Sequence, residues 1–261
     1  MIFMEGPRHK GFYILPNLLT TASLFSGFMG ILWAVEGNYV LCAVAILISC
    51  FFDGLDGKVA RITKANSNFG VQFDSLADLV SFAVSPALMI YLWQTHVFGR
   101  IGVMASFLFI ACSALRLARF NLQSQNRTGK YTKTNKFFVG LPVPAAACTM
   151  ATLVLFSTYL PAEALGQFIA TSCLILLYAL SLLMISRVRY ASFKEVEMVK
   201  AHPFTASVAA IMLFALVASE PKFLGFIFFM AYLLSGLIYT FLIFPLRNGT
   251  FLRGLSRQKL S

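Results

Sequence analysis

The amino-acid sequence predicts an all-α integral membrane protein, a polytopic bundle of about eight transmembrane helices. Of its 261 residues, 59% are hydrophobic and 12% are charged, and the mean hydropathy is +0.78, which excludes a soluble globular domain. A helix needs about 20 apolar residues to cross the hydrocarbon core of a bilayer. Eight such windows follow one another along the chain: residues 14–34, 38–56, 76–95, 101–118, 141–160, 166–186, 203–219 and 223–244.

The windows are separated by short polar stretches, with no long linker. Residues 1–13 carry three charged side chains and are expected to form a short interfacial segment before the first helix. The second window runs directly into charged residues, and the seventh is the shortest. No pair of matching, Gly/Pro-broken half-helices indicates an inverted-repeat transporter. Residues 1–261 are therefore predicted to form one integral membrane domain.

The Lys and Arg residues are distributed unevenly between the two sides of this arrangement. The net charge of +11 would suit nucleic acid only on a water-soluble module, so no nucleic-acid partner is expected. Of the 21 Lys and Arg residues, 19 fall on one side, and Arg100 and Lys222 are the exceptions. Because cytoplasmic loops carry the excess of positive charge, both termini are predicted to be cytoplasmic, in a multi-pass protein of the cell membrane.

All four aspartates of the chain lie within 26 residues, at the cytoplasmic ends of the second and third predicted helices: Asp53, Asp56, Asp74 and Asp78. An ionisable side chain at membrane depth is costly and is therefore a candidate for function. Asp53 and Asp56 share a helical face, and Asp74 and Asp78 are one turn apart on the next helix. The linker 64–69 is short, so we expect the two helices to be antiparallel neighbours whose four carboxylates converge.

Carboxylates this close would repel one another unless cations lay between them. Oxygen ligands without His or Cys favour Mg²⁺ or Mn²⁺, with Ca²⁺ as a mimic, and a shared carboxylate gives the two-metal arrangement used on phosphate esters. Gly57 and Ala60, on the same face, would let a ligand approach the backbone, and Arg61 offers a bidentate fork for a phosphate. These residues indicate a metal-bound, phosphate-bearing substrate at the cytoplasmic membrane surface.

The complete pattern is Asp53-x2-Asp56-Gly57-x2-Ala60-Arg61-x8-Gly70-x3-Asp74-x3-Asp78. At every fixed position it resembles the motif of the CDP-alcohol phosphatidyltransferase family, and the resemblance covers about the first six helices. Eight fixed positions at set spacings make the match specific. The resemblance implies a helical membrane fold, a homodimer among membrane lipids, a CDP-linked lipid bound at the cytoplasmic face, displacement of CMP by an alcohol, and two divalent cations.

The resemblance also implies a role for each matching residue. Asp53, Asp56 and Asp74 would be metal ligands, and Asp78 would be both a ligand and the general base. The Pro16–Thr20 stretch is similar to the start of the family's first helix. The nucleotide lipid CDP-diacylglycerol would be contacted by Asn17, Thr20, Gly57, Ala60, Arg61 and Ser67.

Two further stretches bear on the acceptor alcohol. Residues 116–121 (RLARFN) and 138–145 (FVGLPVPA) resemble the phosphatidylserine synthase branch of that family. This implies transfer of the phosphatidyl group to L-serine, with Arg116, Arg119 and Asn121 as serine-binding residues. The carboxylate of serine needs a cation, and the two arginines are three residues apart on the predicted cytoplasmic rim.

Two alternatives stay open at this point. Within the same chemistry, the acceptor could be glycerol 3-phosphate, inositol phosphate or another alcohol. A divalent-cation transporter would also hold acids in membrane helices. Against transport, the aspartates lie at one edge of the membrane rather than at its midplane, and Arg61 puts a positive charge where a cation path would not hold one.

Overall fold

The structure, a computed structural model, describes residues 14–63, 68–125, 137–160, 166–186, 188–191 and 220–240. Eight α-helices account for most of these residues: α1 (Ile14–Val35), α2 (Tyr39–Ile62), α3 (Asn68–Leu79), α4 (Ser85–Trp93), α5 (Arg100–Gln125), α6 (Val143–Ser157), α7 (Gln167–Ile185) and α10 (Pro221–Ile238). A π-helical segment, η2 (Val80–Val84), joins α3 to α4, and a short 3-10 helix, η3 (Thr95–Phe98), precedes α5.

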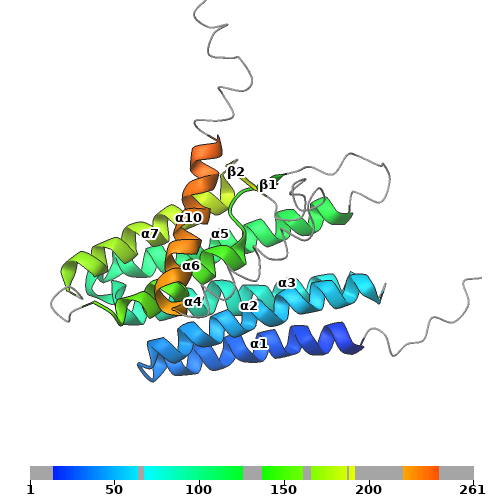
Figure 1. Ribbon diagram of the computed structural model, residues 1–261, viewed down its shortest axis with the longest axis horizontal. Coiled ribbons are helices and arrows are strands. Elements are labelled where there is room, and N and C mark those ends of the chain that lie inside the picture. The colour runs from blue at the N-terminus through cyan, green and yellow to red at the C-terminus, as the bar shows by residue number, and fades with distance from the viewer. Residues whose placement is uncertain are drawn as a thin grey trace, which may run out of the picture.

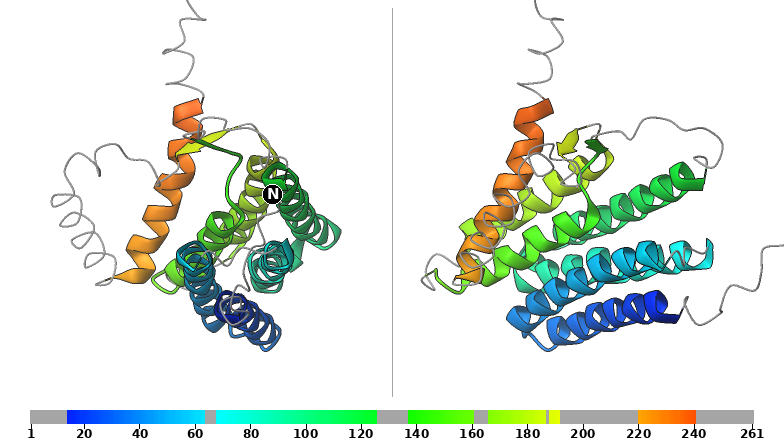
Figure 2. Two further views of the ribbon diagram at one scale, coloured as in Figure 1. Left: turned by 90° about the vertical axis from the view of Figure 1, so that its right-hand side faces the viewer. Right: turned by 45° about the vertical axis from the view of Figure 1, so that its right-hand side comes forward.

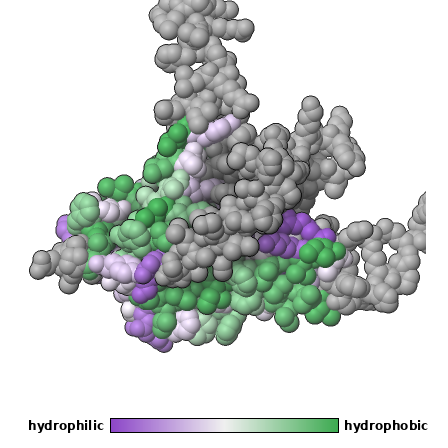
Figure 3. All heavy atoms as spheres, in the orientation of Figure 1, coloured by the Kyte–Doolittle hydropathy of each residue, from purple (hydrophilic) through white to green (hydrophobic). Residues whose placement is uncertain are grey.

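Within the described residues, five helical segments are long and apolar enough to cross a membrane: Ile14–Val35, Tyr39–Ile62, Phe69–Trp93, Arg100–Leu122 and Gln167–Ile185. Many of their exposed side chains are large and apolar. Figure 3 shows such residues along the lower face, where α1 lies in Figure 1. The prediction of a polytopic helical membrane protein is therefore confirmed.

The predicted windows 141–160 and 223–244 correspond to α6 and α10, which are shorter, at 15 and 18 residues. Helix α6 starts after Pro142, since proline is tolerated only around the first turn of a helix. Eleven of its residues are buried, so α6 packs mainly against protein rather than lipid. The window 203–219 lies outside the described residues, and the count of eight spans stays a prediction.

The main packing pairs are α1 with α2, α5 with α7, and α6 with both α2 and α10. Helix α1 packs on α2 and on the α3–η2–α4 segment, while α6 packs between α2 and α10. Figure 1 shows α1, α2 and α3 along the long axis of the molecule, with α10 crossing the other helices steeply. The two views of Figure 2 place α1 and α10 on opposite sides of the bundle.

Helix α1 approaches its neighbours closely because its buried face is made of small residues. Small side chains let membrane helices come close enough for backbone contact. A Cβ atom added at Gly27 would collide with Ser81 of η2, lying 2.6 Å from its Cα atom. The buried residues of α1 are Pro16, Thr20, Ser23, Gly27, Gly30 and Ala34.

The structure adds one element that the sequence did not predict, a two-stranded ladder. Strand β1 (Phe137–Val139) pairs antiparallel with β2 (Arg189–Ala191), with Val139 opposite Arg189. Three-residue strands are too short to show a periodic pattern. After β1, Gly140 adopts a φ of 83° and its amide donates to the carbonyl of Val188 at 2.8 Å. The ladder thereby fixes the chain before α6 beside the end of α7.

Candidate metal centre

Two helices position the four aspartates. Helix α2 continues to Ile62, beyond the predicted end at residue 56, so it carries Asp53 and Asp56 together with Arg61 in its last turn. Helix α3 begins at Asn68, eight residues before the predicted start, and carries the other two aspartates one turn apart. In each helix, the polar residues beyond the most apolar stretch continue the helical spacing. The aspartates of one helix therefore lie on the face that is turned towards the other helix.

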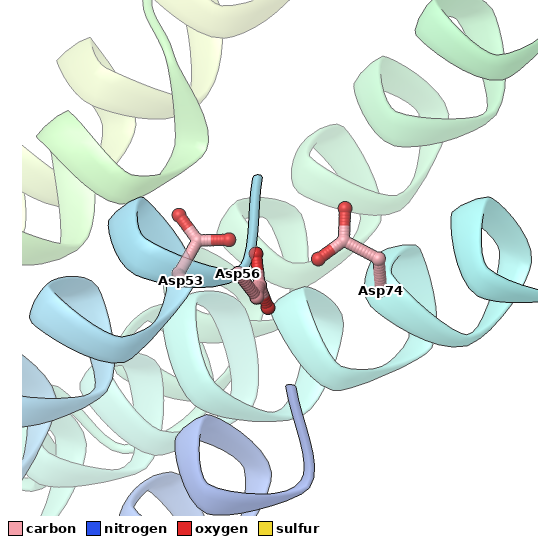
Figure 4. Close-up of side chains that lie close together, drawn as sticks. All are labelled: Asp53, Asp56 and Asp74. Carbon is pink, nitrogen blue, oxygen red and sulfur yellow. The ribbon is translucent and has the colours of Figure 1, made fainter. Parts of the chain in front are cut away.

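Three of the carboxyl groups converge. One oxygen each from Asp53, Asp56 and Asp74 lies within 4.8 Å of the others. Figure 4 shows the two side chains from α2 and the one from α3 pointing into a common space. Asp56 is only 6% exposed, whereas Asp53 and Asp74 are half-buried. The predicted meeting of acids from the two helices is thus present in the structure.

One oxygen of this cluster lacks a partner. The Oδ1 atom of Asp74 is buried and accepts no hydrogen bond from the described residues. A buried polar atom without a partner costs free energy unless a ligand provides one. Three carboxylates with an unpartnered oxygen, and no His or Cys among them, fit a hard divalent cation such as Mg²⁺ or Mn²⁺.

Asp78 stands slightly apart from this trio. It lies one turn after Asp74 on α3, two residues before the π-helical segment, and its carboxyl group lies close to that of Asp53. Single π-helical turns are often found at functional sites because they shift the phase of the side chains around them. The structure therefore brings three of the aspartates together and places Asp78 beside Asp53.

Helix α1 contributes a contact that the sequence reasoning missed. The hydroxyl of Thr20 lies 2.7 Å from Oδ2 of Asp56, and Thr20 is 5% exposed. Thr20 was expected to face the nucleotide, together with Asn17. The structure places its hydroxyl beside a carboxylate of the cluster, and Asn17 is half-buried, while their contacts with a nucleotide stay a prediction. One feature could have indicated this contact: Thr20 lies on the face of α1 that carries small residues and is buried in the structure.

The other residues expected to contact the nucleotide lie along α2. Gly57 is exposed, and an added Cβ atom there would meet no atom of the described residues within 4 Å, so the space over its backbone is open among them. Ala60 is half-buried and Arg61 is exposed. Ser67 lies outside the described residues. The open backbone at Gly57, one residue after Asp56, leaves room for a ligand beside the carboxyl cluster.

The three residues expected to bind serine have different surroundings. Arg116 is half-buried, its Nη2 donates to the Gly140 carbonyl at 3.5 Å, and its buried Nε has no partner among the described residues. Arg119 is exposed. The amide of Asn121 donates to Ser75 at 2.9 Å, which ties α5 to α3. Arg116 therefore has a buried donor without a partner among the described residues, while Asn121 ties α5 to the helix that carries Asp74.

The family model for CDP-alcohol phosphatidyltransferases matches residues 13–178. The chain belongs to the CDP-alcohol phosphatidyltransferase family. The matched CDP-alcohol phosphatidyltransferase region contains α1 to α6, all four aspartates and the predicted serine-binding residues, and it ends within α7, before α10.

Three curated relatives extend this comparison. The chain is 41% identical over 186 residues to a CDP-diacylglycerol–serine O-phosphatidyltransferase of Helicobacter pylori, which covers 71% of this chain and 75% of the relative. It is 35% identical over 189 residues to an archaetidylserine synthase of Methanothermobacter thermautotrophicus, covering 72% and 73%. It is 35% identical over 230 residues to a CDP-diacylglycerol–serine O-phosphatidyltransferase of Mycobacterium leprae, covering 87% and 74%.

Proposed function

We propose that this chain is a CDP-diacylglycerol–serine O-phosphatidyltransferase of phospholipid biosynthesis, which transfers a phosphatidyl group to L-serine and releases CMP. The observation that carries the proposal is the convergence of Asp53, Asp56 and Asp74, with an unpartnered oxygen on Asp74, in a chain of this family. The relatives named as serine transferases support serine as the acceptor.

The aspartates would hold two divalent cations, Mg²⁺ or Mn²⁺. Asp53, Asp56 and Asp74 would be ligands, and Asp78, which lies beside Asp53, would join them. When bound, the cations would neutralise the diphosphate and stabilise the charge that develops on it. The oxygen-only donor set supports hard ions over zinc or copper.

CDP-diacylglycerol would lie along the end of α2. The open backbone at Gly57 and the small side chain of Ala60 would let the cytidine diphosphate approach the helix, and Arg61 would pair with its diphosphate. Asn17 and Ser67 are proposed to contact the nucleotide from the start of α1 and from the α2–α3 linker. Thr20 would support this site through Asp56.

Asp78 would act as the general base. It would take the proton of the serine hydroxyl while the serine oxygen bonds to the phosphorus that carries the diacylglycerol, and the bond from that phosphorus to the CMP oxygen would break. Arg116 and Arg119 would bind the carboxylate of serine, and the unpartnered Nε of Arg116 supports this role. No covalent enzyme intermediate is required.

The proposed topology is eight spans in one integral domain, with both termini and the active site on the cytoplasmic side of the cell membrane. The location of 19 of the 21 Lys and Arg residues on that side supports this orientation. A homodimer is proposed from the family resemblance.

The test is release of CMP from CDP-diacylglycerol by the purified full chain in detergent, with Mn²⁺ or Mg²⁺ and with a panel of acceptors. We expect release that requires both metal and L-serine. If CMP is released with metal but only in the presence of another alcohol, such as glycerol 3-phosphate, that alcohol is the acceptor and the proposed transfer reaction still holds. Release of CMP in the presence of EDTA would contradict the metal centre.

A further inference from the structure

The contact between Thr20 and Asp56 joins the first helix to the carboxyl cluster. The donor–acceptor distance is 2.7 Å, and both residues are almost completely buried. A hydroxyl carries one proton, so Thr20 can donate either to Asp56 or to the Pro16 carbonyl at 3.1 Å. The shorter distance and the charged acceptor favour Asp56.

The position of Thr20 relative to α2 is fixed by two further hydroxyl side chains of α1, those of Ser23 and Ser26. The hydroxyls of Ser23 and Ser49 lie 2.7 Å apart, and that of Ser49 is 3.0 Å from the Ser23 carbonyl. Ser26 donates to the Ala45 carbonyl at 2.8 Å. These bonds fix the register of α1 against α2, and with it the position of Thr20 relative to Asp56.

We propose that Thr20 is a positioning residue that orients the Asp56 carboxylate for a divalent cation. By holding Oδ2, the hydroxyl would fix the rotation of the carboxylate about its Cβ–Cγ bond and leave the other oxygen available to a cation. Groups that orient a metal ligand by hydrogen-bonding to it are needed for full metal affinity. Their removal lowers that affinity by about 10- to 100-fold. This inference rests on the proposed metal centre and differs from the expected role of Thr20 as a nucleotide contact.

The experiment measures Mn²⁺ binding by the full chain in detergent, from the loss of the electron paramagnetic resonance signal of free Mn²⁺, without substrate. Thr20→Val keeps the shape of the side chain and removes the hydroxyl, whereas Thr20→Ser keeps the hydroxyl. We expect Thr20→Val to bind Mn²⁺ about 10- to 100-fold more weakly, and Thr20→Ser to bind within about threefold of wild type.

Thr21→Val is the matched control. The Thr21 hydroxyl donates to the Asn17 carbonyl at 2.7 Å, and the side chain is exposed, so this variant loses only a bond within α1. We expect it to bind Mn²⁺ like wild type. A similar loss in Thr21→Val and Thr20→Val would assign the effect to the helix and overturn the proposal.

Kinetics separate the positioning role from a nucleotide contact. If Thr20 acts through Asp56, excess Mn²⁺ should restore most of the activity of Thr20→Val, and its KM for CDP-diacylglycerol should return to that of wild type. A raised KM with unchanged Mn²⁺ affinity would overturn the inference while the metal centre stands. Absence of Mn²⁺ binding by the wild-type protein would overturn the metal centre itself.

Discussion

Replacing Asp74 with asparagine should stabilise the metal-free protein and remove its response to Mn²⁺. The carboxylate oxygens of Asp53, Asp56 and Asp74 lie within 4.8 Å of one another. Without a cation, they repel one another, and Asp74 also leaves Oδ1 without a partner. The substitution removes one charge and supplies an amide that can donate to a neighbouring carboxylate. The cluster of carboxylates is therefore expected to lower the stability of the protein when no cation is bound.

The size of the effect follows from the geometry. At 4.8 Å, two unit charges repel by about 3.5 kcal/mol at an effective dielectric constant of about 20. Because Asp53 and Asp74 are half-buried, water weakens this repulsion, and we expect a gain of about 2 kcal/mol for Asp74→Asn. For a chain of this size, that corresponds to a rise of roughly 4 to 8 °C in the midpoint of thermal unfolding.

The assay is thermal unfolding in detergent, with EDTA or with Mn²⁺. Mn²⁺ at 100 times its dissociation constant should stabilise the wild-type protein by about 2.7 kcal/mol, and this increase should be absent in Asp74→Asn. Glu36→Gln is the control, because Glu36 is exposed between α1 and α2, at the opposite end of α2 from the cluster. A lower metal-free midpoint for Asp74→Asn, combined with a wild-type response to Mn²⁺, would refute the reasoning.

Three further predictions concern the substrate site. Gly57→Ala should fold normally, since its added Cβ meets no atom within 4 Å, but should raise the KM for CDP-diacylglycerol roughly tenfold; Gly54→Ala, equally unhindered, is the control. Asp78→Asn should still bind CDP-diacylglycerol in an equilibrium assay but lose at least about 100-fold in kcat, whereas Asp53→Asn should lose binding as well; an active Asp78→Asn would remove the base assignment. Arg116→Lys should raise the KM for serine about tenfold with little change in kcat, and an unchanged KM would place the serine carboxylate elsewhere.

The meeting of the aspartates was predictable because each helix fixes its own side-chain phase. The spacing of Asp53 and Asp56, and of Asp74 and Asp78, places each pair on one face of its helix, and the short linker between the helices limits how they can pack. Those two constraints do not specify where Asp78 lies relative to the trio. That position depends on the packing of α1 against η2, where Gly27 meets Ser81.

Contacts between helices distant in sequence were harder to predict. The Thr20–Asp56 bond depends on the register of α1 on α2, which the serine pairs set only after the helices have packed. Asn121 was assigned to serine binding from its motif, yet its amide donates to Ser75 of α3. In both cases the residue type was informative, but its partner depended on the crossing of two helices, which helical periodicity does not encode.

The location of the cluster suits a reaction between a lipid and a water-soluble alcohol. Along α2, burial changes from Ser49, fully buried against α1, to Gly57 and Arg61, which are exposed. The same helices expose large apolar side chains, with Phe51 64% exposed on α2 and Leu76 64% exposed on α3. A site at this boundary can take acyl chains from the lipid side while cations and serine enter from water. Carboxylates placed deeper in the membrane would lose access to the cations and to serine, which come from water.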